Sequence, residues 1–104
     1  ANNFMDGTGA AGKFGIVFRG LVDHCIINSN VITGFGSDGI KLTATSDRNI
    51  ISSNICRNNG GWGINIAAAT CDENLVHGNI LQTNTSGTIQ DLGTTTTSAD
   101  NVLS

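Results

Sequence analysis

The chain has 104 residues and a formal net charge of −3, with 14 glycines, no proline and only 12% charged residues. Its five Lys and Arg residues are scattered, which argues against a nucleic-acid partner, and no apolar run approaches the roughly 20 residues that span a bilayer. Ser, Thr and Asn, which disfavour helix interiors, are abundant. We therefore expect an all-β domain with little or no α-helix and no membrane insertion.

A repeat with a period of 24 residues organises most of the chain. Gly-Ile pairs begin at Gly15, Gly39 and Gly63, and Gly87 marks the next period. Each pair opens a short apolar alternation that is typical of a strand. Because a fixed period of this length indicates a repeat architecture, we expect these strands to occupy the same place on successive coils. The glycines are expected at a turn that needs positive φ or a close approach of backbone.

A second apolar segment follows each Gly-Ile strand and repeats with offsets of 24 and then 25 residues. It carries a column of asparagines at Asn30, Asn54 and Asn79. Asn tolerates the left-handed backbone at a bend, and stacked amides can hydrogen-bond along the axis; we favour this structural interpretation over a ligand contact. Together the elements predict a right-handed parallel β-helix, a solenoid of about four coils.

Alternation along the strands assigns the core of the solenoid. We expect these residues to point inward: Ile16, Ile40, Ile64, Phe18, Leu42, Ile66, Ile27, Ile51, Val76, Ile32, Cys56 and Leu81. Their apolar neighbours, such as Ile26, Ile50 and Leu75, would then point outward. Either a bend at the Asn column turns both sets inward, or another subunit covers this face.

The two ends of the chain depart from the repeat. We expect one β-helical domain over residues 1–104, with an irregular start (1–14), regular coils (15–86) and a looser terminal coil (87–104). So few coils expose strand edges at both ends, which invites association. The chain is therefore expected to be a piece of a longer solenoid or one strand of an oligomer. Its three cysteines have a spacing that predicts neither a disulfide framework nor a zinc site.

The candidate catalytic residues are acidic and lie in loops. Asp23, Asp47 and Asp72 occupy equivalent positions, and Asp100 continues the series with slipped register. Neighbouring carboxylates would lie about one strand spacing apart, close to the separation used by retaining glycosidases, and such crowding would raise one pKa to make an acid/base pair. Ca²⁺ could bridge them, although we predict no dedicated metal site and no other cofactor. The alternative is structural, because Asp at a turn commonly accepts backbone N–H bonds.

A neighbouring column and one aromatic residue are candidates for substrate binding. His24, Arg48 and Glu73 adjoin the acidic column, where they form either a surface ion-pair ladder or the edge of a sugar-binding groove. Trp62 can stack on a sugar ring, or it simply covers a turn.

The run from Gly15 to Leu81, with its Gly-Ile-x-apolar and Ile-x-x-Asn-x-apolar elements, resembles the parallel β-helix repeat. Pectate-lyase-like carbohydrate enzymes and the tailspike or appendage proteins of tailed phages share this repeat. The low charge and the Thr- and Asn-rich tail are most similar to the phage appendages, which implies a virion or extracellular location and a homotrimer that binds, and often degrades, host cell-surface polysaccharide. The alternative is a fragment of a secreted polysaccharide lyase, hydrolase or epimerase, so the resemblance leaves enzymatic activity open.

Overall fold

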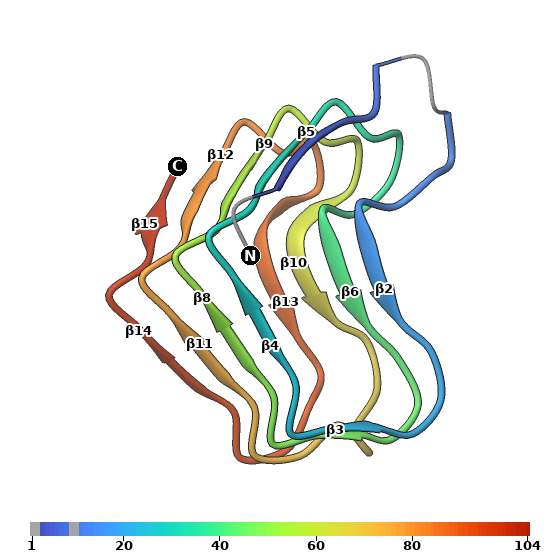
Figure 1. Cartoon of the computed structure of the whole chain (residues 1–104), viewed down its shortest axis with the longest axis vertical. Coiled ribbons are helices and arrows are strands. Elements are labelled where there is room, and N and C mark those ends of the chain that lie inside the picture. Colours follow the sequence, from blue (N-terminus) through green and yellow to red (C-terminus); the bar gives the residue numbers. More distant parts are fainter. Residues whose placement is uncertain (1–2, 9–10) are drawn as a thin grey trace.

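The computed structural model of the chain describes residues 3–8 and 11–104. These residues form short strands and contain no helix. The described part of the chain therefore has no membrane-spanning helix. The chain winds so that each strand pairs in parallel with its equivalent in the next coil (Figure 1). The expected all-β parallel solenoid of about four coils is confirmed.

Three sheets form the walls of the solenoid. Sheet 1 consists of β2 (Ile16–Phe18), β6 (Ile40–Leu42), β10 (Trp62–Ile66) and β13 (Gly87–Asp91). Sheet 2 consists of β4 (Ile26–Asn28), β8 (Ile50–Ser52), β11 (Leu75–His77) and β14 (Thr97–Ala99). Sheet 3 consists of β1 (Phe4–Asp6), β5 (Val31–Thr33), β9 (Ile55–Arg57), β12 (Ile80–Gln82) and β15 (Val102–Leu103). A minor two-stranded sheet, β3 (Val22–Asp23) with β7 (Ser46–Asp47), lies in the chain between sheets 1 and 2.

The strand register reproduces the repeat and corrects it at one place. Ile40 pairs with Ile64, as the 24-residue offset requires. The prediction that Gly87 marks the next period is wrong, because Gly87 pairs with Trp62 while Ile89 pairs with Ile64. The last coil is therefore offset by 25 residues from the one before it in sheet 1.

The inward columns form one continuous apolar core. Its fully buried members are Ile32, Ile40, Leu42, Ile51, Cys56, Ile64, Ile66, Val76 and Leu81, together with Cys71 from outside these columns, and Ile27 is nearly so. In the first coil, Ile16 and Phe18 are half-buried and pack against this core. Burial raises the pKa of the Cys56 thiol to about 12, so Cys56 behaves as a small hydrophobe, and all three cysteines are free.

The glycines of the Gly-Ile pairs are needed for close approach of backbone. A Cβ at Gly39 would lie 2.7 Å from the carbonyl oxygen of Gly63, and one at Gly63 would lie 2.8 Å from that of Thr88. Real Cβ atoms do not come so close, so each position excludes a side chain. Neither glycine has positive φ; the close-approach interpretation is right and the positive-φ one is wrong.

The Asn column is a ladder of amide hydrogen bonds. Asn54 Oδ1 accepts a hydrogen bond from the backbone N–H of Asn30 at 3.0 Å, and the N–H of Asn54 donates to Asn79 Oδ1 at 2.9 Å. The left-handed conformation belongs to the residue before the amide, such as Ser53 with φ of 58°. Amide stacking is confirmed, whereas the prediction that the asparagines themselves adopt the left-handed conformation is wrong.

Two further amide ladders were missed from the sequence. The N–H of Asn49 donates to Asn74 Oδ1 at 2.9 Å, and the N–H of Asn59 donates to Asn84 Oδ1 at 3.2 Å. The first of these begins at Cys25, whose N–H donates to Asn49 Oδ1 at 2.8 Å. The 25-residue spacing of each Asn pair was the available signal. Amide ladders thus line three corners of the coil.

Candidate functional site

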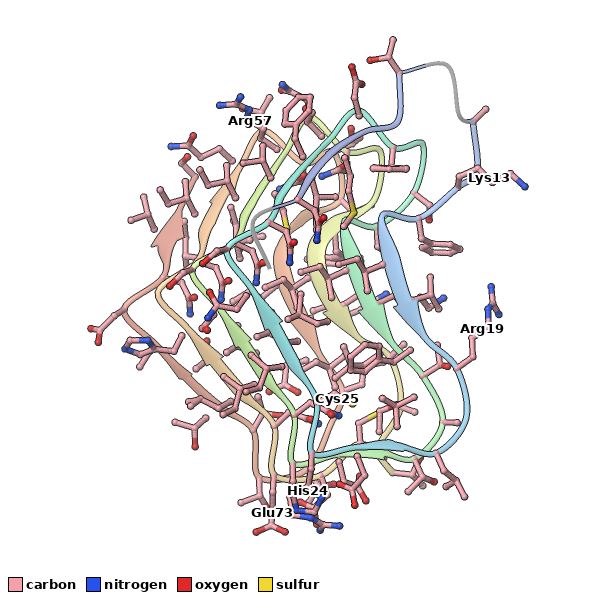
Figure 2. All side chains as sticks on the ribbon, viewed as in Figure 1. Lys13, Arg19, His24, Cys25, Arg57 and Glu73 are labelled. Carbon is pink, nitrogen blue, oxygen red and sulfur yellow. The ribbon has the colours of Figure 1, made fainter. Side chains whose placement is uncertain are left out.

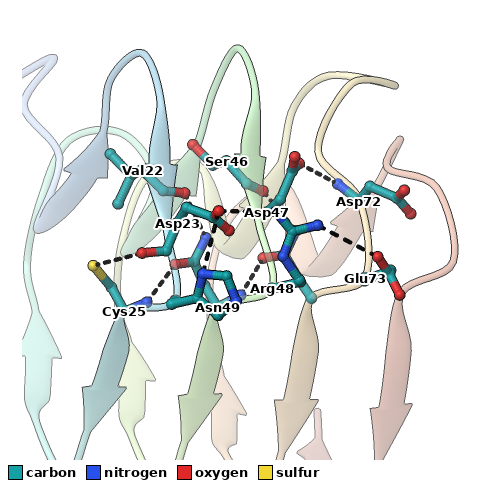
Figure 3. A network of polar contacts seen from close by, with 11 residues as sticks. Val22, Asp23, Cys25, Ser46, Asp47, Arg48, Asn49, Asp72 and Glu73 are labelled. Atoms are coloured by element: carbon teal, nitrogen blue, oxygen red, sulfur yellow. Dashed lines mark hydrogen bonds and ion pairs between the residues drawn. The ribbon is translucent and has the colours of Figure 1, made fainter.

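The acidic column lies where the chain passes from sheet 1 to sheet 2. Register pairs Asp23 with Asp47 in the minor sheet, and Asp72 follows in the next coil, where it bridges to Thr94 (Figure 3). The structure therefore brings these three carboxylates to equivalent positions in successive coils. Their catalytic role stays a prediction.

Asp100 does not continue this column, contrary to the expectation. It has φ of 55° and immediately precedes Asn101, whose Oδ1 accepts the N–H of Asn79 at 2.9 Å. Asp100 therefore sits at the corner between sheets 2 and 3. Its Oδ2 lies 3.2 Å from Nε2 of His77, an exposed contact.

The three carboxylates of the column have different partners. Asp47 Oδ1 accepts the backbone N–H of Asp72 at 2.9 Å, so it accepts a backbone N–H as the structural interpretation expected, but from the next coil and not from its own turn. Asp23 Oδ2 instead accepts from Arg48 Nη2 at 2.8 Å, while Asp72 Oδ1 is buried without a hydrogen-bond partner. The column is thus regular in backbone position and irregular in side-chain contacts.

Asp23 has an electrostatic environment that favours its ionised form. The hydrogen bond from Arg48 is the main reason that the pKa of Asp23 lies below its usual value; the charges of Arg48 and His24 add to the effect, and desolvation opposes it. A general acid needs a raised pKa to hold its proton near neutral pH. Asp23 therefore suits the part of a base, a nucleophile or an ion-pair partner, and the expected upward shift does not occur at this carboxylate.

The neighbouring column forms an ion-pair ladder. Arg48 bridges two coils, with Nη2 lying 2.8 Å from Asp23 Oδ2 and Nη1 lying 3.5 Å from Glu73 Oε1 (Figure 3). His24 Nδ1 is also 3.2 Å from Asp23 Oδ2. All four side chains are at least 41% exposed, and His24 and Glu73 project from the same edge of the molecule (Figure 2). The ladder interpretation describes this geometry, while a role of these residues in sugar binding stays a prediction.

Trp62 is not part of this cluster. It opens β10, and Asp72 lies beyond the other end of that strand; the strand alone spans about 13 Å at the usual rise per residue. Its indole covers Gly87, where an added Cβ would lie 2.6 Å from the ring. Trp62 therefore packs on the first residue of the neighbouring strand β13, and both sugar stacking and the covering of a turn stay predictions.

A second polar cluster on sheet 1 was missed from the sequence. The buried carboxylate of Asp38 accepts the N–H of Trp62 at 2.7 Å and the Nδ2 of Asn65 at 3.1 Å. Asn65 is only 7% exposed, and its Oδ1 has no hydrogen-bond partner. The available signal of this cluster was the polar Asn65 between the apolar Ile64 and Ile66. Alternation alone predicts that Asn65 points outward and is exposed.

Neither a cleft nor a metal centre is built by the residues that the structure describes. No cavity opens among them, and they contain no cluster of three or more His, Cys, Asp or Glu side chains that could hold a metal ion. A bridging Ca²⁺ therefore rests on the stacked carboxylates alone.

The comparison with protein families decides the affiliation. A family model described as the right handed beta helix region matches residues 1–103. The chain belongs to the right-handed β-helix family. No curated protein matches it, and no solved structure does. Right-handed β-helices are often carbohydrate-related, but a fold hosts many functions, so the specific role has to be argued from the surface of this β-helix.

Proposed function

We propose that this β-helix is a segment of a phage tail appendage, in which three copies pack into a shaft that binds polysaccharide on the host cell surface. The observation that carries the proposal is a pair of apolar columns that face outward on sheets 2 and 3. A solenoid wall needs only its inward residues to be apolar. Contiguous apolar side chains on the outside therefore favour a surface that is covered in the assembly.

Sheet 2 contributes the first outward column. Ile26 is 65% and Ile50 is 37% exposed, and register continues the column through Leu75. The Asn corner does not turn Ile26 and Ile50 inward, so that alternative from the sequence is wrong for them. Coverage by another subunit remains as the explanation that we propose.

Sheet 3 contributes the second column, which runs through all of its strands. Register aligns Phe4, Val31, Ile55, Ile80 and Val102. The two ends of this column are the most open, with Phe4 67% and Val102 52% exposed. Only the corner of the Asn column separates it from the column on sheet 2 (Figure 1).

Two adjacent apolar faces suit a closed ring of copies. In cyclic symmetry above twofold, each subunit uses one patch toward one neighbour and a different patch toward the other. The corner between sheets 2 and 3 would then point toward the symmetry axis. A trimer arranged in this way leaves sheet 1 on the outside, where a polysaccharide can reach it.

The mass of the assembly in solution tests this proposal. We expect light scattering to give three chains per particle, and Ile50→Asp to dissociate the particle because it places a charge in the apolar contact. Val17→Asp, an outward change on sheet 1, is the matched control and should leave the trimer intact. Circular dichroism verifies that each variant stays folded. A wild-type monomer, or a trimer that survives Ile50→Asp, would contradict the proposal.

A polysaccharide-degrading enzyme fragment is the second candidate. The observation in its favour is the register of Asp23 with Asp47, which puts the backbones of these two acidic residues about one strand spacing, 4.8 Å, apart. Asp47→Asn keeps an oxygen to accept the N–H of Asp72 and removes only the charge. If the column is catalytic, this change lowers glycan cleavage by at least about a hundredfold; unchanged turnover would exclude Asp47 from the mechanism.

A further inference from the structure

The corner between sheets 3 and 1 contains the one Asn-Gly pair of the sequence, Asn59-Gly60. Asn59 lies between β9 and β10 and belongs to the amide ladder of this corner. In the other two ladders, the residue that follows each asparagine is bulky and apolar and begins a strand. Glycine has no Cβ, so Asn59 is the ladder amide whose C-terminal neighbour hinders an approach to it least.

The fold requires both residues of this pair. Asn59 Oδ1 accepts the N–H of Phe35 at 3.0 Å, which continues the ladder toward the N-terminus. A Cβ at position 60 would overlap the carbonyl oxygen of Gly36 in the preceding coil, so only glycine fits there. The coil therefore dictates an Asn-Gly sequence at a place where its backbone passes close to the coil before it.

An Asn-Gly pair undergoes a spontaneous reaction with water. The backbone nitrogen of the glycine loses its proton and attacks Cγ of the asparagine side chain. The new C–N bond closes a succinimide ring, and the side-chain nitrogen takes up the proton and leaves as ammonia. Water then opens the ring at either carbonyl, which leaves aspartate or isoaspartate. Because glycine puts no side chain in the way, this attack meets less hindrance at Asn59 than at any other asparagine of the chain.

The folded corner holds both reacting groups in hydrogen bonds. Asn59 is 1% exposed, and its Nδ2 donates to Asn84 Oδ1 at 3.0 Å and to the carbonyl of Ile32 at 3.3 Å. The N–H of Gly60, which supplies the attacking nitrogen, donates to the carbonyl of Phe35 at 2.7 Å. The attack needs the side chain to turn toward its own backbone and the N–H to leave its acceptor. Both sets of hydrogen bonds must therefore break first.

The product does not fit the place that the amide occupied. A carboxylate at position 59 has no N–H to donate to Asn84 Oδ1 or to the Ile32 carbonyl, and it brings a charged oxygen against these two buried oxygens. Isoaspartate also adds a carbon to the main chain, which moves the following residues out of register with the preceding coil. A chain modified at Asn59 therefore cannot close this corner again.

We propose that Asn59 is a self-modification site whose reaction is controlled by the amide ladder of this corner. While the corner is closed, Asn59 keeps its amide and the ladder is complete. When the corner is open, the Gly60 nitrogen attacks, ammonia is released and the conversion is permanent. The pair thus acts as a timer that removes slowly folding or reopened chains from the folded population. This role holds whether or not copies of the chain assemble.

Peptide mass spectrometry of the whole chain tests the proposal. One sample is kept folded in buffer and the other unfolded in guanidinium chloride, at the same mildly alkaline pH and temperature. We expect Asn59 to be converted at least about a hundredfold more slowly in the folded chain, which corresponds to an opening free energy of about 2.8 kcal/mol. Asn84, which the β-branched Thr85 follows, should stay intact while Asn59 reacts in the denaturant. Equal rates in the two samples, or faster conversion of Asn84, would overturn the proposal.

Two matched variants test whether this particular ladder controls the reaction. Asn84 and Asn101 each end a ladder, and each accepts the N–H and the Nδ2 of the amide before it. We expect Asn84→Ala to speed the conversion of Asn59 in the folded chain by at least about tenfold. Asn101→Ala, at another corner, should change it by less than about twofold. Equal acceleration by both variants would mean that global unfolding exposes Asn59, and it would overturn control by the ladder.

Refolding of the wild-type chain gives a test that needs no variant to fold. After increasing times in guanidinium chloride the sample is diluted, and the refolded particles are separated by size-exclusion chromatography. Those particles should retain the amide of Asn59, while the modified chains remain in the unfolded or aggregated fraction. Asn59→Asp, which copies one product directly, should lose the β-sheet signal in circular dichroism. Modified chains that refold as well as unmodified ones would overturn the proposed timer.

Discussion

Two corners of the coil make the same bend and use it differently. Between sheets 2 and 3, Ser53 has φ of 58° and is followed by Asn54; between sheets 1 and 2, Arg48 has φ of 51° and is followed by Asn49. Both amides are completely buried and accept an N–H from the preceding coil. The left-handed residue of this coil is exposed at both corners; Ser53 is uncharged, whereas Arg48 is charged. The fold thus requires the buried amide, whereas the side chain of the exposed residue before it can vary. A charged side chain such as that of Arg48 can therefore occur at the left-handed position.

The largest effect is expected at the buried amide. Asn54→Ala removes the acceptor of the Asn30 N–H and the donor to the Ile27 carbonyl, both of which are buried. We expect a loss of about 3 kcal/mol in the free energy of unfolding, because the groups left behind have no access to water. Urea denaturation measures it. Asn101→Ala, at the half-buried end of the same ladder, should cost about 1 kcal/mol; equal losses would show that burial does not set the strength of the ladder.

A smaller effect with a change of sign is expected next to that amide. Ser53→Gly relieves the left-handed strain of a residue with a Cβ and should raise the free energy of unfolding by about 0.5 kcal/mol after the entropy of the unfolded glycine is deducted. Ser52→Gly, one residue earlier within β8, should lower it by about 0.5–1 kcal/mol. Urea denaturation measures the free energy of unfolding of both variants. If both substitutions change it in the same direction, the assignment of strain to position 53 is refuted.

The smallest effect on stability is expected at the charged corner. Arg48→Gln removes exposed ion pairs, which are screened by water and salt. Because the pKa of Asp23 in the folded protein lies below its ordinary value, the pair contributes at neutral pH and its contribution is lost as the pH falls through the folded pKa. The thermal midpoints of variant and wild type should therefore differ slightly at neutral pH and converge in acid.

Titration of Asp23 by NMR gives the sharper measurement of the same change. In Arg48→Gln its pKa should move up toward the ordinary value, since the first cause of the depression is the hydrogen bond from Arg48. Arg57→Gln is the control, because Arg57 lies on sheet 3 and makes no ion pair with Asp23. An unchanged titration of Asp23 in Arg48→Gln would mean that the ion pair does not form in solution.

Most of the fold could be predicted because its core is built from columns. If the strands of successive coils stack, equivalent residues such as Ile40 and Ile64 stack with them. The equal spacing of these residues in the sequence predicts this arrangement. Spacing does not say which of two neighbouring residues takes the left-handed conformation, so Ser53 was overlooked in favour of Asn54. It also fails where a coil gains one residue, which is why Gly87 was aligned one place too far along the coil.

Less of the candidate site could be predicted, because its contacts depend on side-chain reach. The column of Asp23, Asp47 and Asp72 follows from spacing. Spacing does not predict that Arg48 donates a hydrogen bond to Asp23 or that Asp47 accepts a backbone N–H. These contacts are decided by rotamers at an exposed corner. Positions along the solenoid are thus encoded by the repeat, whereas partners across its surface are not.

The amide ladders have a direction with a consequence for synthesis of the chain. Asn54 Oδ1 accepts from the N–H of Asn30, and Asn79 Oδ1 in turn accepts from the N–H of Asn54. Each amide therefore reaches back toward the N-terminus and completes the coil made before it. On the ribosome, a coil keeps its corner N–H groups open until the following coil emerges, and that following coil brings the matching oxygens. The β-helix therefore grows one coil at a time, and the corner N–H groups of each coil gain their acceptors only when the next coil has been made.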